Sequence, residues 1–147
     1  MAVIDDYLVK LDLYADDDYI SDGCILVVKE KLSLDLLKKY KNYSHNIMGK
    51  IPFERGEVYK LPCNVSLYLH EKLYFDVDDK YTVDYEYIKQ FAKSFTDITF
   101  TIVWCTDYPI LKVWQGDNFI GCIALAHKGT ANAQYHFDFE SDDDDMF

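Results

Sequence analysis

Hydrophobic and polar side chains alternate along several short segments of this chain, which is the period of a strand with one buried face. Residues 7–14 show the pattern first, because aliphatic side chains alternate there with Lys10 and Asp12. The polar run 15–23 then predicts a turn. The apolar and β-branched run 24–29 predicts a central strand. We therefore expect the chain to begin with a half-buried strand followed by a buried one.

A helical period comes next. Ser33 can cap a helix at 34–41, in which Leu34 and Leu37 follow the helical period. Lys38, Lys39 and Lys41 then point outward. This helix would present a basic surface.

The second predicted helix follows Thr82, which we expect to be its N-cap. Asp84 and Glu86 then belong to its first turn, where the helix dipole favours negative charge. Its apolar stripe consists of Ile88, Phe91, Ala92 and Phe95.

The rest of the chain has the pattern of strands separated by turns. His70, Glu71 and Lys72 fit a tight hairpin turn. The predicted strands lie at 53–62, 64–70, 72–77, 98–105, 110–115, 119–127 and 133–139. Long sheet segments with separate helices predict an α+β fold, a mainly antiparallel sheet with two helices packed on one face. We expect a single domain at 1–140 and a short, flexible acidic C-terminal tail at 141–147.

The composition is that of an ordinary folded domain. The chain has 147 residues, of which 50% are hydrophobic, enough for one core. No run approaches the ~18 apolar residues that span a bilayer, and the N-terminus lacks the pattern of a signal peptide. We therefore expect a cytoplasmic protein that has no membrane partner. The cysteines are widely spaced, which favours buried reduced thiols over disulfides or a zinc site: Cys24, Cys63, Cys105 and Cys122.

Catalytic and cofactor signatures are missing from the sequence. It contains no nucleotide-binding or hydrolase motif, so we expect neither an enzyme nor a cofactor. The acidic runs at 14–23 and 76–84 hold hard oxygen ligands, but they do not follow the ligand spacing of a calcium-binding loop. His136 and Asp138 share one face of the last predicted strand, which fits a weak metal or acid–base pair and equally a solvated strand edge. We predict no metal site.

The net charge of −11 is unevenly distributed. Residues 1–28 carry seven acidic side chains and one basic one, and residues 129–147 carry six acidic side chains and no basic one. Residues 29–60 reverse the balance, with eight basic and four acidic side chains. Arg55 is the only arginine, whereas specific readers of bases and phosphates rely on the bidentate guanidinium. A sequence-specific nucleic-acid reader is therefore not expected.

An acidic domain without a catalytic motif is suited to binding a basic protein, because its field steers association and can occupy a nucleic-acid-binding cleft. Immunity proteins against nuclease toxins and phage anti-defence proteins that mimic DNA are similar to it in composition. We therefore predict a small module that inhibits or neutralises a basic, nucleic-acid-binding protein partner. The residues expected to bind this partner lie in the acidic turns and the tail: Asp16, Asp17, Asp18, Asp22, Asp76, Asp78, Asp79, Asp142, Asp143, Asp144, Asp145 and Phe147.

The basic stretch of the chain supports a different ligand. Lysines interleaved with tyrosines can hold single-stranded DNA, with lysines on the backbone and rings under the bases. A lysine-rich exposed helix face explains the same pattern. The residues concerned are Lys38, Lys39, Tyr40, Lys41, Tyr43 and Lys50.

The chain ends in DDDDMF, an acidic run closed by a terminal aromatic residue. This tip resembles the end of bacterial and phage single-stranded-DNA-binding proteins, although Met146 stands where a proline is usual. The resemblance covers about six of 147 residues and implies a tail that recruits replication and repair enzymes. A viral single-stranded-DNA-binding or replication-associated protein is therefore the alternative function. An acidic end that only keeps the chain soluble also accounts for the aspartates.

Overall fold

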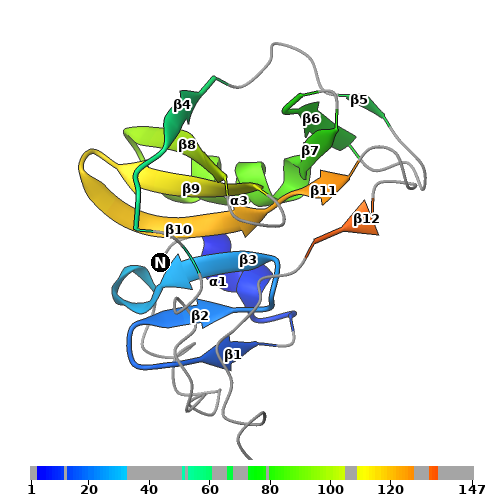
Figure 1. The fold of residues 1–147 in the computed structure, drawn as a ribbon. Coiled ribbons are helices and arrows are strands. Elements are labelled where there is room, and N and C mark those ends of the chain that lie inside the picture. The colour runs from blue at the N-terminus through cyan, green and yellow to red at the C-terminus, as the bar shows by residue number, and fades with distance from the viewer. Residues whose placement is uncertain are drawn as a thin grey trace, which may run out of the picture.

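The computed structural model describes residues 3–11, 13–32, 51, 53–60, 66–67, 73–78, 80–104, 109–127 and 133–135. This part of the chain is mostly antiparallel sheet with two helices, in a single domain (Figure 1). The predicted α+β class is confirmed at that level. The acidic tail, the predicted helix at 34–41 and the predicted hairpin turn at 70–72 lie outside the described residues.

The larger of two sheets, here called the large sheet, contains the centre of the fold. Neighbouring strands in it are antiparallel throughout. Within the described residues its strand order is β1 (Tyr14–Ala15), β2 (Tyr19–Ser21), β3 (Ile25–Val28), β10 (Asn118–Ala124), β9 (Pro109–Gln115), β8 (Ile98–Trp104) and β4 (Glu57–Tyr59).

The second sheet, here called the small sheet, continues from the large one. Its described strands are, in order, β12 (Ala133–Gln134), β11 (Ala126–His127), β7 (Tyr81–Asp84), β6 (Leu73–Asp76) and β5 (Ser66–Leu67). Leu125 alone separates β10 from β11, so one run of chain passes from the large sheet into the small one. The predicted strand 119–127 is therefore split at Leu125, whose side chain is fully buried and whose carbonyl accepts a hydrogen bond from the Tyr135 amide (2.9 Å).

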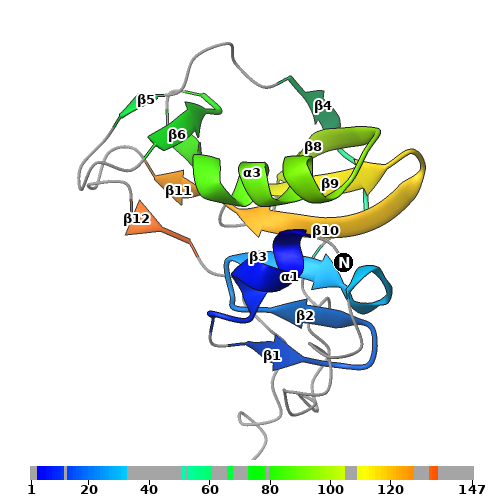
Figure 2. The ribbon, with the colours of Figure 1, turned by 180° about the vertical axis from the view of Figure 1, so that it is seen from behind.

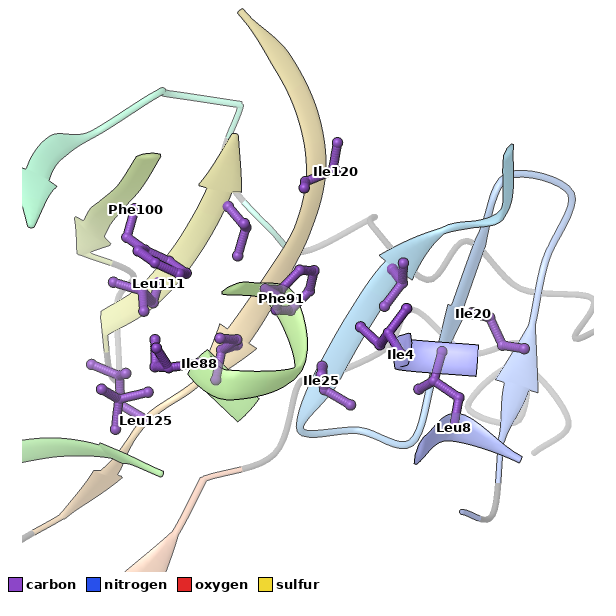
Figure 3. Packing of buried hydrophobic residues seen from close by; sticks show 14 of the residues in the cluster. Ile4, Leu8, Ile20, Ile25, Ile88, Phe91, Phe100, Leu111, Ile120 and Leu125 are labelled. Carbon is purple, nitrogen blue, oxygen red and sulfur yellow. The ribbon is translucent and has the colours of Figure 1, made fainter. Parts of the chain in front are cut away.

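Helices α1 (Val3–Leu8) and α3 (Tyr85–Ser94) lie side by side on one face of the large sheet (Figure 2). The amide of Ile4 donates to the Ser94 hydroxyl (2.7 Å), which joins the two helices. Figure 3 shows Ile4, Ile25 and Phe91 in the apolar layer between these helices and the sheet. Each aliphatic or aromatic side chain buried in such a layer contributes roughly 1.5–3 kcal/mol of transfer free energy.

Helix α3 confirms the second predicted helix but begins later than predicted. Thr82 is not its N-cap, because its backbone belongs to β7 and pairs with Ala126. The cap is Asp84, whose carboxylate accepts a hydrogen bond from the Glu86 amide (2.8 Å). Ala92 is exposed, so its place in the predicted apolar stripe was also wrong. The stripe is narrower than predicted because the sheet covers only part of the helix surface.

The predicted strand at 7–14 is wrong. The chain is helical at Val3–Leu8 and becomes extended only at β1. Ile4 and Leu8 lie four residues apart and are both fully buried, which places them on one helical face. The alternation that follows Tyr7 therefore did not reflect a strand.

The strand predicted at 24–29 is confirmed as β3, which lies between β2 and β10. The predicted turn at 15–23 contains one strand that the sequence pattern did not show, β2, in which Ile20 is fully buried opposite Val27. The predicted strands at 98–105 and 110–115 correspond to β8 and β9. Four other predicted strands appear as shorter strands in the described residues: 53–62 as β4, 64–70 as β5, 72–77 as β6 and 133–139 as β12.

Gly121 allows β10 to lie close both to the backbone of β3 and to a side chain of α3. A Cβ atom at this position would collide with the Leu26 carbonyl oxygen and would lie 2.6 Å from the Phe91 ring at Cζ. The pairing of β10 with β9 is irregular between Phe119 and Gly121. The closest approach of helix and sheet therefore depends on the absence of a side chain here.

We expect Gly121→Ala to lower the free energy of unfolding by about 1–3 kcal/mol, because the backbone of Leu26 cannot move aside easily. Urea denaturation monitored by circular dichroism measures this change. Gly116→Ala is the control: its φ is +60° but the nearest atom is 3.8 Å from the added Cβ, so only the backbone cost of about 1 kcal/mol applies. Equal losses for both variants would contradict the tight packing.

Candidate functional site

The predicted acidic turns are Asx turns, in which one carboxylate holds the backbone that follows it. Asp16 Oδ1 accepts hydrogen bonds from the amides of Asp18 (2.9 Å) and Tyr19 (2.7 Å). Asp22 Oδ1 accepts from Cys24 (2.8 Å) and Ile25 (2.9 Å). Some of the aspartates of the chain therefore fix the backbone of its turns.

Asp78 repeats this arrangement in the small sheet. Its Oδ1 accepts from the amides of Lys80 (2.8 Å) and Tyr81 (2.9 Å), which starts β7. Asp76 is exposed at the end of β6, and its carbonyl accepts a hydrogen bond from the Tyr59 hydroxyl (2.8 Å). The Tyr59 contact connects β4 of the large sheet to the small sheet.

The structure does not gather the described residues of the two predicted acidic turns at one place. Asp16, Asp17 and Asp18 precede β2, whereas Asp22 follows it, so they lie at opposite ends of one strand (Figure 1). Asp76 and Asp78 belong to the small sheet. The other candidates lie outside the described residues: Asp79, Asp142, Asp143, Asp144, Asp145 and Phe147 for the basic partner, and Lys38, Lys39, Tyr40, Lys41, Tyr43 and Lys50 for nucleic acid.

One acidic turn forms the wall of a pocket, here called the acidic pocket, with a volume of about 540 Å³. The turn between β1 and β2 lies on one side, and the short 3₁₀ helix η1 (Lys29–Lys31) and the start of β10 lie on the others. Its lining residues are Asp17, Asp18, Tyr19, Val28, Lys29, Glu30 and Phe119.

Hydrogen bonds fix the walls of the acidic pocket. The Lys29 ammonium group donates to the Asp16 carbonyl (2.8 Å), and the Lys29 amide donates to the Asp18 carbonyl (2.8 Å). Asp17, Asp18 and Glu30 are exposed, so their charges face solvent at the mouth of the pocket. Lys29 also lines the pocket and is held by the backbone of the turn, so three carboxylates and one ammonium group lie around a partly apolar floor.

Aromatic rings continue from the floor of the pocket across the outer face of the large sheet. The Tyr19 and Phe119 rings are 6.4 Å apart at 75°, and the Trp114 and Phe119 rings are 5.6 Å apart at 73°. Burial raises the pKa of the Tyr19 phenol, and the charges of Asp18 and Asp16 raise it further. The three rings are here called the aromatic row, which begins beside the acidic turn.

Two cations of the chain itself lie on the aromatic row. The Arg55 guanidinium is 4.4 Å from the centre of the Trp114 ring, and the Lys112 ammonium is 5.8 Å from the centre of the Phe119 ring. Lys112 is only 2% exposed and donates to the Glu54 carbonyl (2.6 Å). Cations at such distances are attracted to the electron-rich face of a ring.

Arg55 combines three kinds of contact. Its guanidinium stacks on Trp114, donates to the Gly116 carbonyl (3.3 Å) and lies 3.9 Å from the Asp117 carboxylate. The Arg55 carbonyl in turn accepts a hydrogen bond from the Thr101 hydroxyl. Ring, carbonyl and carboxylate thus hold one guanidinium on this face of the sheet.

A second pocket, of about 480 Å³, lies on the helical side of the molecule. Burial raises the pKa of Tyr7 and Tyr87 well above the usual value, and the Asp22 and Asp84 charges add to the rise in both. Lys89 is 3.8 Å from Glu86 in the same pocket. Its lining residues are Tyr7, Leu73, Asp84, Tyr85, Glu86, Tyr87 and Lys89.

A third group of side chains was missed by sequence reasoning. Trp104 is 55% exposed at the end of β8, and its ring centre lies 5.9 Å from that of Tyr81. Tyr81 also contacts His127 and Tyr135.

Glu30, Tyr19 and Phe119 of the acidic pocket were missed as well, because they are distant in sequence and only the pairing of β2, β3 and β10 brings them together.

The described residues show no grouping of three His, Cys, Asp or Glu side chains that would hold a metal ion. None of the helices in the described part is long and apolar enough to cross a membrane. Cys24 and Cys122 are buried thiols, as predicted, whereas Cys63 and Cys105 lie outside the described residues. No protein-family model, curated protein or solved structure has a significant match to this chain.

We expect Asp16→Ala to lower the free energy of unfolding by about 1 kcal/mol, because two amides at the start of β2 lose their acceptor. Urea denaturation measures the change. Asp17→Ala removes the same charge from an exposed neighbour and should change stability by less than about 0.5 kcal/mol. Asp16→Asn retains an acceptor oxygen and should restore most of the loss. Equal effects of Asp16→Ala and Asp17→Ala would refute the Asx role.

The raised tyrosine pKa values predict a loss of stability at high pH. Above pH ~10 the phenol of Tyr87 ionises in the unfolded chain but keeps its proton in the folded one. The unfolded state then binds fewer protons, so the free energy of unfolding falls as pH rises. We expect Tyr87→Phe to make this fall shallower between about pH 10 and 12, measured by urea denaturation at each pH. A slope matching that of the wild type and of the surface variant Tyr14→Phe would contradict the prediction.

Proposed function

We propose that this protein is a small acidic binding module that inhibits or neutralises a basic, nucleic-acid-binding protein. The observation that carries the proposal is the acidic pocket, in which three exposed carboxylates surround a floor of aromatic rings. Protein interfaces commonly combine a buried aromatic anchor with a charged rim. Lysine and arginine side chains of a partner fit both parts of the pocket.

The charge of the whole chain supports the same kind of partner. A net charge of −11 produces a negative field that accelerates encounter with a basic surface. Such a protein can occupy the partner's nucleic-acid-binding cleft in place of the phosphate backbone. In this proposal the domain at 1–140 carries the main contact, the tail at 141–147 adds a flexible acidic one, and the protein acts in the cytoplasm without catalysis.

The alternative proposal is a viral single-stranded-DNA-binding or replication-associated protein whose tail recruits partner enzymes. The aromatic row supports it, because stacked rings with nearby cations bind unpaired bases. Asp17, Asp18 and Glu30 oppose it, since their charges repel phosphates at one end of that row. We therefore prefer the protein partner.

The test removes charge from the pocket and leaves its shape unchanged. We expect the triple variant Asp17→Asn, Asp18→Asn and Glu30→Gln to weaken binding to a panel of basic nucleases about tenfold or more, measured by biolayer interferometry at low salt. The matched control Asp6→Asn, Glu57→Gln and Asp97→Asn removes three exposed charges elsewhere and should weaken binding much less. Wild-type affinity should fall as salt rises.

Two results would contradict the proposed function. Equal losses in the two triple variants would mean that net charge alone drives binding. Binding of fluorescent single-stranded DNA by the full chain, tightened in a chain that ends at Glu140, would favour the alternative, because an acidic tail competes with phosphates for a basic surface. Fluorescence anisotropy at low salt measures the DNA binding.

A further inference from the structure

The aromatic row already binds cations at two of its three rings. The guanidinium of Arg55 covers Trp114, and the ammonium of Lys112 lies near Phe119. Tyr19, the remaining ring, lines the acidic pocket. Two rings of the row thus contact cations of the chain itself, and the third ring, Tyr19, lies at an open pocket.

The Arg55 contact shows which chemistry this face of the sheet accepts. A flat guanidinium stacks on a ring while its N–H groups reach a carbonyl and a carboxylate. Arginine is suited to such a site because its planar group both stacks on aromatic faces and forms several directed hydrogen bonds, whereas lysine acts as a compact point charge. Arg55 is the only arginine of the chain. A second guanidinium stacked on this face would therefore have to come from another molecule.

The acidic pocket contains the same kinds of group, aromatic rings and carboxylates, at the other end of the row. Tyr19 and Phe119 supply ring surface, and Asp17, Asp18 and Glu30 supply carboxylates around it. A volume of about 540 Å³ has room for one long side chain together with water. Lys29 is held by the Asp16 carbonyl and fixes the wall of the pocket.

We propose that the acidic pocket is the site of a single anchoring arginine of the partner, whose guanidinium stacks on Tyr19 and hydrogen-bonds to the carboxylates of the rim. This rests on the proposed function, because it specifies how the basic partner is recognised. The site is selective: arginine gains a stacking contact at Tyr19 that lysine makes less well. A cation over an exposed ring changes affinity by about two- to fivefold.

The test compares hexa-arginine with hexa-lysine, which carry the same charge, on the full chain by isothermal titration calorimetry. We expect hexa-arginine to bind about two- to fivefold more tightly. Tyr19→Leu should abolish the preference while leaving hexa-lysine affinity nearly unchanged, and Tyr19→Phe should retain it. Tyr14→Leu, which removes a 47% exposed tyrosine on β1, is the matched control and should also retain it.

The possible outcomes separate this inference from the proposed function. Equal binding of both peptides overturns the arginine site but leaves a basic partner in place. A preference that persists in Tyr19→Leu overturns the site as well, because the arginines are then recognised elsewhere, for example by the tail. Binding of neither peptide overturns both proposals. Urea denaturation of Tyr19→Leu confirms that the variant is folded before the comparison is made.

Discussion

Strand β10 is buried on both of its faces, and the rest of the structure depends on that position. Ile120 and Ile123 point toward the helices, whereas Phe119 and Cys122 lie on the opposite side. The strand pairs with both β3 and β9 and then runs through Leu125 into the small sheet. A single run of chain thus packs in the core, contributes a ring to the aromatic row and joins the two sheets.

The acidic residues have two separate roles in this fold. Asp16, Asp22 and Asp78 each hold two backbone amides in the turns that precede β2, β3 and β7. Asp17 and Asp18 lie within the first of these turns and are exposed to solvent. Some aspartates therefore shape the backbone, while their neighbours present carboxylates to solvent.

The outer face of the large sheet holds two cations of the chain itself. Lys112 is buried and bound to the Glu54 carbonyl, while Arg55 lies over Trp114 at the surface. Both contacts attach the segment before β4 to the sheet. The acidic pocket at the other end of the aromatic row keeps the rings but exposes its carboxylates, which makes it suited to a cation from another molecule.

The sequence by itself determined the class of the fold and the positions of its strongest elements. The helix α3 and the strands β8 and β9 were predicted from the pattern of apolar and polar positions. The strand β3 was predicted from its continuous apolar run, which fits a strand buried on both faces. The same reasoning failed at Val3–Leu8, where the four-residue spacing of Ile4 and Leu8 was overlooked in favour of the alternation that follows. It also assigned the helix cap to Thr82, although Asp84 is the better-placed acceptor.

Only the tertiary structure decided which acidic residues line the acidic pocket. Asp17 and Glu30 are separated along the chain by two strands, and Phe119 comes from the other half of the sequence. Strand pairing brings them together, and pairing depends on contacts between residues distant in sequence, which no local pattern encodes. The charge of the protein is therefore a property of its sequence, whereas the pocket that concentrates this charge around aromatic rings is a property of its fold.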